Sequence, residues 1–183
     1  LLYLRCLFDK EKFVSVRNIT EPIKSGTTIL YDILRYIDSS RADQNVIEAA
    51  NRYISSAVPK LDRSYISPEG FFKINYTTKG VHAVAPDDTN GNGTPDYIEK
   101  IAEAFDHVKK VTCSERGFRT PILDKGKNTL EINVYDLDGV YGITFPVNYY
   151  YSKITGIKTA SSKISIDNNY SPSKGKFLPF AEI

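Results

Sequence analysis

The chain has 183 residues, of which 41% are hydrophobic and 25% are charged, and its net charge is +2. These values are ordinary for a globular protein, and the length suits one domain with or without a small appendage. The lysines are scattered and form no basic stripe, which excludes the usual signature of nucleic-acid binding. No apolar run approaches the roughly 20 residues that a membrane-spanning helix needs, so no membrane span is expected.

Residues 1–60 are predicted to form a small bundle of short helices. Apolar side chains recur at helical spacing in residues 29–37, where Thr27 is a candidate N-cap, and again in residues 46–57. The core of such a segment is thin, so we expect it to dock on the rest of the chain. Its position also leaves open the interpretation that it is a pro-segment covering a cleft.

Residues 61–183 are predicted to form a second unit. Residues 61–70 are rich in turn residues and are predicted to be a linker. Apolar and polar side chains then alternate through residues 71–78, which predicts a strand. An apolar stripe from Pro95 to Ser114 that includes Val108 predicts a helix, with acidic residues early and lysines late, as the helix dipole favours.

The region after this helix is predicted to return to the sheet. Alternation predicts a second strand at residues 130–135 and a third that ends at Ile166. Residues 143–160 are predicted to be irregular, with a short hairpin around Tyr149–Tyr151. The order strand–helix–strand–strand predicts an α/β (α+β) fold with a mixed twisted sheet and one long backing helix.

The most informative stretch is residues 88–99, which has the spacing of an EF-hand-like calcium loop. Ca²⁺ prefers six to eight oxygen ligands at about 2.3–2.6 Å, which such a loop supplies from positions 1, 3, 5, 7, 9 and 12. Gly93 occupies position 6, where the chain must turn sharply. The candidate calcium ligands at the six positions are Asp88, Asn90, Asn92, Thr94, Asp96 and Glu99.

A plain turn is the alternative interpretation of this stretch. Asn-Gly pairs form turns without metal, and Asp96 and Glu99 also suit a helix N-terminus. Agreement at every ligand position and at the glycine favours the calcium loop. Because two of the ligands are neutral asparagines, we expect weak to moderate affinity, as in extracellular modules whose sites fill at about 0.1–1 mM.

Several other residues are of types that can form disulfides, bind metals or act in catalysis. Cys6 and Cys113 are either free thiols, which we favour, or one disulfide. The oxygen-rich stretches that contain Asp136 and Asp138 and that follow Ile166 (Asp167, Asn168 and Asn169) are predicted to be polar turns. No serine lies in a Gly-x-Ser-x-Gly elbow and no phosphate-binding glycine loop is present, so no catalytic residue is assigned.

An ordered set of motifs carries a resemblance over residues 61–183. The motifs are Phe72-Lys-Ile-Asn-Tyr-Thr, Asp88-x-Asn-Gly-Asn-Gly-x-Pro-Asp-Tyr-x-Glu99, Gly117-Phe-x-x-Pro121, Tyr135 to Tyr141-Gly142, and Ile166-Asp-Asn-x-Tyr170. Together they resemble secreted bacterial and archaeal zinc metallopeptidases related to the immune-inhibitor-A group. Residues 1–60 resemble the N-terminal region of those proteins more loosely.

The resemblance implies a zincin-like upper subdomain in a secreted hydrolase that acts on proteins or peptides. In that group a zinc-binding HExxH helix follows the last strand, and the tail Leu178–Ile183 resembles the approach to it. This chain has no HExxH, and its only histidines, His82 and His107, lie far apart in a predicted loop and on a predicted helix surface. Neither is assigned as a zinc ligand, because a catalytic zinc needs three protein ligands.

Two functions follow from these observations. The first is the N-terminal portion of a secreted, calcium-stabilised metallopeptidase-like protein, in which Zn²⁺ would bind only in a longer parent chain and this part alone would be inactive. The alternative is an extracellular binding or adhesion domain that binds calcium and has no catalytic activity.

Overall fold

The computed structural model describes residues 27, 31, 35, 44, 58–137, 141–151, 156 and 158–168. Within the N-terminal segment, the predicted helical state is confirmed at Tyr31, Arg35 and Gln44, and Thr27, a candidate N-cap, already lies in a helix. The rest of that prediction, Cys6 and the tail Leu178–Ile183 lie outside the described residues.

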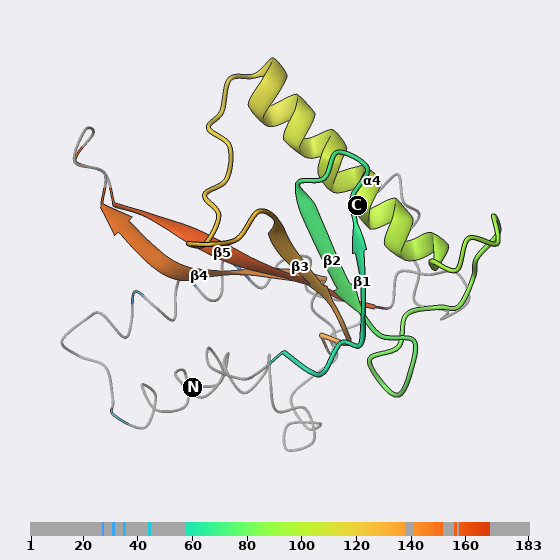
Figure 1. The fold of residues 1–183 in the computed structure, drawn as a ribbon. Coiled ribbons are helices and arrows are strands. Elements are labelled where there is room, and N and C mark those ends of the chain that lie inside the picture. The colour runs from blue at the N-terminus through green and yellow to red at the C-terminus, as the bar shows by residue number, and fades with distance from the viewer. Residues whose placement is uncertain are drawn as a thin grey trace, which may run out of the picture.

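A five-stranded mixed sheet forms the centre of the described chain (Figure 1). Its strands in chain order are β1 (Arg63–Ile66), β2 (Phe72–Tyr76), β3 (Leu130–Val134), β4 (Gly142–Tyr151) and β5 (Lys158–Ile166). Their spatial order is β1-β2-β3-β5-β4. The pairs β2–β3 and β3–β5 are parallel, whereas β1–β2 and β4–β5 are antiparallel. The mixed sheet and its helix agree with the predicted α+β class.

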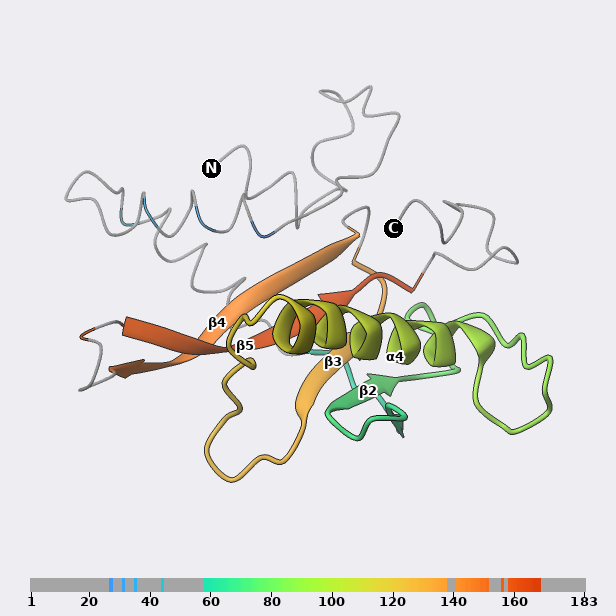
Figure 2. The same ribbon diagram turned by 90° about the horizontal axis from the view of Figure 1, so that it is seen from above.

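Helix α4 (Asp96–Lys109) makes the crossover between the parallel strands β2 and β3 and lies over one face of the sheet (Figure 2). Parallel strands require such a crossover, and a helix is its usual form. The helix continues as a π-helical turn, η3 (Lys110–Glu115). It ends at Gly117, whose positive φ of 71° suits a glycine at a helix end.

The hydrophobic core lies between α4 and the sheet. Ile74 and Ile132 face each other across β2 and β3, and both are fully buried, as is Ile98 on the helix. The rings of Phe72 and Phe105 add a contact with centroids 5.1 Å apart. The apolar side chains on one face of the strands and on the stripe of the helix therefore pack into the same core, as the sequence predicts.

The strand β4 forms one edge of the sheet and also contacts the N-terminal segment. The backbone N of Thr144 donates a hydrogen bond to Thr27 Oγ1 at 3.0 Å. An edge strand presents unpaired backbone groups, and this contact covers one of them.

Three sequence predictions are wrong in detail. Residues 61–70 are not all linker, since β1 lies within them and pairs with β2. Residues 143–151 and 158–160 are not irregular, because they belong to the antiparallel strands β4 and β5, which pair with a register shift between Pro146 and Tyr149. Val108, assigned to the apolar stripe, is 54% exposed. On this last turn, Asp106 and Lys109 face the turn between β1 and β2, and Val108 lies on another side of the helix.

Candidate functional site

The predicted calcium loop lies immediately before α4 and projects from the body of the molecule (Figures 1 and 2). Its base is closed where the backbone N of Asp96 donates to the carbonyl O of Asp87 at 2.7 Å. Gly93 has a φ of +86°, a backbone conformation that residues with a Cβ rarely adopt. The glycine at position 6 therefore allows the sharp turn that the sequence predicts. The helix then begins at Asp96, and Glu99 lies on its first turn.

The Asp88 carboxylate is hydrogen-bonded to the backbone at the tip of the loop. Its two carboxylate oxygens accept hydrogen bonds from the backbone N of Asn92 at 3.1 Å and of Gly93 at 2.8 Å. The side-chain oxygens of Asn90 and Asn92 each accept from the backbone N two residues further on, at 3.0 and 2.8 Å. These local bonds hold the side chains at positions 1, 3 and 5 against the backbone of the loop tip.

Glu99 closes the loop from the helix. Its carboxylate oxygens accept hydrogen bonds from the side-chain Nδ2 of Asn90 at 2.9 Å and of Asn92 at 2.6 Å. The structure therefore brings Asp88, Asn90, Asn92 and Glu99 together. Carboxylate and amide oxygens are the ligands that Ca²⁺ takes, and this side-chain set fits that ion by chemistry and by spacing.

Asp96 is turned away from this cluster. Its carboxylate accepts hydrogen bonds from the backbone N of Thr89 at 3.0 and 3.2 Å and also contacts the Thr89 hydroxyl. These contacts with Thr89 lower the pKa of the Asp96 carboxyl. Thr94 donates its backbone N to Asn92, whereas its predicted calcium ligand is the carbonyl oxygen.

No group of three or more His, Cys, Asp or Glu side chains that could hold a metal ion is present in the described part of the chain. The loop offers Asp88 and Glu99 as charged ligands and draws its other oxygens from amides and backbone. His107 is exposed on α4, and His82 lies in the loop after β2, so both histidines have the positions that the sequence predicts. Cys113 is a free thiol.

Asp167 and Asn168 form a buried corner after β5, which we call the β5 corner. The sequence predicts a polar turn here, and the two residues are only 4% and 0% exposed. Asn168 Nδ2 donates to the carbonyl oxygens of Val81 and Ala83, and the Tyr97 hydroxyl donates to the carbonyl oxygen of Asp167 at 2.6 Å. Its partners are 70 to 87 residues away, so no local sequence signal reveals this role.

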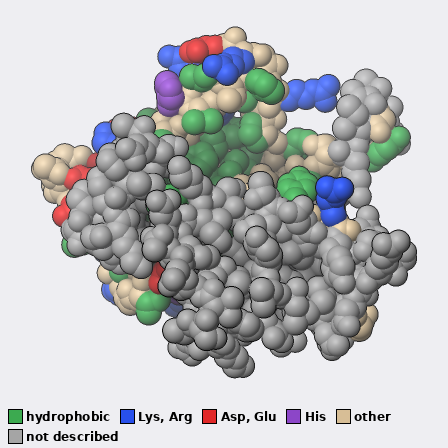
Figure 3. All heavy atoms as spheres, turned by 180° about the vertical axis from the view of Figure 1, so that it is seen from behind, with side chains coloured by type: hydrophobic (Ala, Val, Ile, Leu, Met, Phe, Trp, Pro, Cys, Tyr) green, Lys and Arg blue, Asp and Glu red, His purple; other side chains and the backbone are tan. Residues whose placement is uncertain are grey.

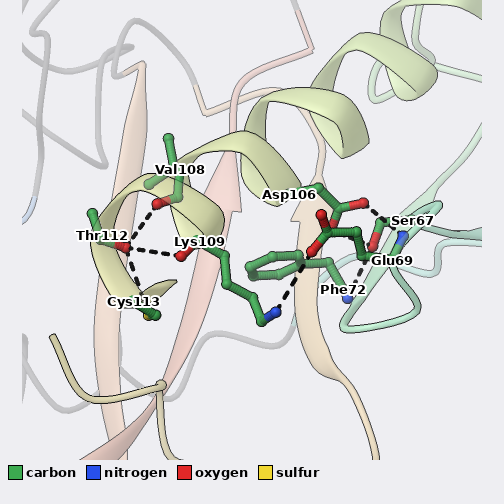
Figure 4. A network of polar contacts seen from close by, with 8 residues as sticks. All are labelled: Ser67, Glu69, Phe72, Asp106, Val108, Lys109, Thr112 and Cys113. Atoms are coloured by element: carbon green, nitrogen blue, oxygen red, sulfur yellow. Dashed lines mark hydrogen bonds and ion pairs between the residues drawn. The ribbon is translucent and has the colours of Figure 1, made fainter. Parts of the chain in front are cut away.

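A second buried carboxylate fixes the far end of α4 (Figure 4). Asp106 accepts hydrogen bonds from Ser67 Oγ at 2.8 Å and from the backbone N of Glu69 at 2.9 Å. The Lys109 Nζ lies 3.6 Å from a carboxylate oxygen of Glu69. These contacts join the turn between β1 and β2 to the last turn of the helix.

A third polar cluster joins the loop before β3 to the β4–β5 hairpin. Asp124 Oδ1 accepts hydrogen bonds from Asn148 Nδ2 at 2.8 Å and from the hydroxyl of Ser161. The Ser161 hydroxyl, with Asn148, holds the pKa of the Asp124 carboxyl below its usual value of 3.8. The stability that this contact contributes is therefore present above about pH 4 and lost as the pH falls through the lowered pKa.

We expect Ser161→Ala to lower the free energy of unfolding by about 1–3 kcal/mol at neutral pH, because the Ser161 hydroxyl donates to Asp124 and accepts from the backbone N of Asn148. The part of this loss that comes from Asp124 should shrink as the pH falls through the lowered pKa of the Asp124 carboxyl. Thermal melts at a series of pH values measure it. Ser165→Ala is the control, because the Ser165 hydroxyl is buried on the same strand without a hydrogen-bond partner. A difference between wild type and Ser161→Ala that stays constant with pH would contradict the assignment.

Exposed hydrophobic side chains gather beneath the end of α4 in the view from behind (Figure 3). The large hydrophobic residues that are exposed around this end of the helix and the loop after it are Val108, Phe118 and Ile122. No helix among the described residues is long and apolar enough to span a membrane.

The chain matches no protein-family model, no curated protein and no solved structure.

Proposed function

We propose that this chain is the calcium-binding N-terminal portion of a secreted metallopeptidase-like protein with a zincin-like fold. The observation that carries the proposal is the convergence of Asp88, Asn90, Asn92 and Glu99 at the start of the helix that backs a mixed sheet. The ordered motifs of residues 61–183 supply the link to the immune-inhibitor-A group. In such a protein the substrate would be a protein or peptide.

The calcium ion would act structurally. When bound, it supplies a divalent charge that the carboxylates of Asp88 and Glu99 offset. In the structure, the amides of Asn90 and Asn92 donate to Glu99. For the ion to bind, these amides must turn their oxygens inward. Such a rearrangement is local, because amide oxygens and nitrogens have nearly the same shape.

The catalytic zinc would be bound by residues outside this chain. No described side chains here are assigned to the reaction, so this portion alone is proposed to be inactive. This portion would contribute the sheet and the backing helix, and a zinc-binding helix would follow them in the parent protein.

A calcium-binding adhesion or binding domain without catalysis is the second candidate. The exposed hydrophobic side chains of Val108, Phe118 and Ile122 favour it, since exposed apolar surface suits contact with a partner protein. The same calcium loop would serve both candidates.

The coding sequence that follows Ile183 distinguishes the two. We expect an HExxH motif within the next ten or so residues, where the two histidines on one helical face would bind zinc. A protein expressed through that motif should cleave a general protein substrate in a zinc-dependent manner. A continuation without the motif, or a full-length protein with no peptidase activity after zinc loading, would favour the binding domain.

A further inference from the structure

The β5 corner holds the segment that leads into the calcium loop. Asn168 Nδ2 donates to the carbonyl oxygen of Val81 at 3.2 Å and of Ala83 at 2.8 Å. Because both partners are acceptors, the amide nitrogen must face them, and the orientation of the side chain is fixed. The next residues are also held, since the backbone N of Val84 donates to the carbonyl of Thr77 at 3.0 Å.

The same corner holds the segment that leaves the loop. The Tyr97 hydroxyl donates to the carbonyl oxygen of Asp167 at 2.6 Å, and Tyr97 is only 7% exposed. Burial, together with the charge of Asp167, raises the pKa of the Tyr97 phenol, so it stays protonated and remains a donor. Tyr97 is two residues before Glu99 on the first turn of α4.

The corner is itself fixed to the sheet. The backbone N of Asp167 donates to the carbonyl oxygen of Tyr141 at 3.0 Å, and Asp167 Oδ1 accepts from the backbone N of Leu137 at 2.8 Å. Residues 84–96 thus lie between two segments that are both hydrogen-bonded to Asp167 and Asn168. The β5 corner therefore holds the segments that enter and leave the calcium loop, in addition to the hydrogen bond from Asp96 to Asp87 that closes the base of the loop.

Two buried polar atoms at the corner have no hydrogen-bond partner among the described residues. They are Asn168 Oδ1 and His82 Nδ1. A buried polar atom without a partner costs free energy, so this arrangement is not the most stable one for the corner alone. The same arrangement forms the two hydrogen bonds from Asn168 to Val81 and Ala83, in the segment that leads into the calcium loop.

We propose that the β5 corner, Asp167 and Asn168 with Tyr97, positions the calcium loop. It holds the two stems at the separation at which Asp88 and Glu99 reach one ion, and bound calcium in turn fixes the end of β5. The proposal rests on the calcium binding proposed above. Coupling of this kind is reciprocal, so whatever loosens the corner must weaken calcium binding.

Calcium titration of the whole chain by calorimetry tests the proposal. Tyr97→Phe removes only the hydroxyl, and Asn168→Ala removes both hydrogen bonds that the Asn168 side-chain amide donates. Each should weaken calcium binding about tenfold, within the range usual for coupled sites. Ser67→Ala is the matched control, because it breaks a buried hydrogen bond at the opposite end of α4. It should lower the melting temperature and leave the calcium affinity unchanged.

Hydrogen exchange on the wild-type chain supplies a second readout that needs no variant. The amides of Asp167 and Leu137 should exchange more slowly with calcium than with EDTA. If the wild type binds calcium but the folded variants bind it equally well and this exchange is unchanged, the positioning role is overturned and calcium binding stands. If the wild type binds no calcium, the calcium site itself fails, and the positioning role fails with it.

Discussion

Calcium at about 10 mM should raise the melting temperature of this chain by roughly 3–10 °C, and EDTA should reverse the rise. A ligand that binds only the folded state stabilises it by RT ln(1 + [L]/Kd). With a Kd of about 0.1–1 mM, as two neutral asparagines suggest, this amounts to about 1.4–2.7 kcal/mol. For a chain of this size, 1 kcal/mol shifts the melting temperature by about 2–4 °C.

Glu99→Gln should abolish most of this response. It removes one of the two charges that face the loop interior and the carboxylate at position 12, which can bind calcium through two oxygens. Glu103→Gln is the matched control, because Glu103 is on the same helix and pairs with Lys100 on the surface. Thermal melts with calcium, magnesium and EDTA measure the effect. An unchanged melting temperature in wild type, or a full calcium response in Glu99→Gln, would contradict the site.

Ile132→Ala should lower the free energy of unfolding by about 2–5 kcal/mol, because it leaves a cavity at the centre of the core. Ile132 is fully buried on β3, the central strand, between Ile74 and Ile164 in the sheet and beneath α4. Ile132→Val should cost only about 0.5–1.5 kcal/mol, since one methylene group is lost. Denaturant unfolding followed by circular dichroism measures both changes.

Ile66→Ala is the control for position in the sheet. Ile66 is on the edge strand β1 and is 48% exposed, so its truncation should cost about 0.5 kcal/mol or less. Equal losses for Ile132→Ala and Ile66→Ala would mean that the core does not lie between this sheet and α4.

Much of the central fold could be predicted from the sequence. Phe72, Ile74 and Tyr76 alternate with polar residues, and the stripe that contains Ile98 and Ala102 recurs at helical spacing, so β2 and α4 were predicted in type and place. Strand β1 was missed because it is a short edge strand whose residues are mostly exposed, which leaves almost no hydrophobic alternation. The β4–β5 hairpin was predicted too short, because Pro146 and a register shift interrupt its pattern.

The sequence by itself determined the core strands, the helix and the spacing of the calcium loop, because each depends on neighbours within a few turns or strand positions. Only the tertiary structure decided that Asp96 faces Thr89 while Glu99 faces Asn90 and Asn92. Only it revealed that Asp167 and Asn168 are buried and hold both stems of that loop. The physical reason is that a side-chain amide or a carbonyl takes whatever partner the fold brings to it, and these partners are distant in sequence.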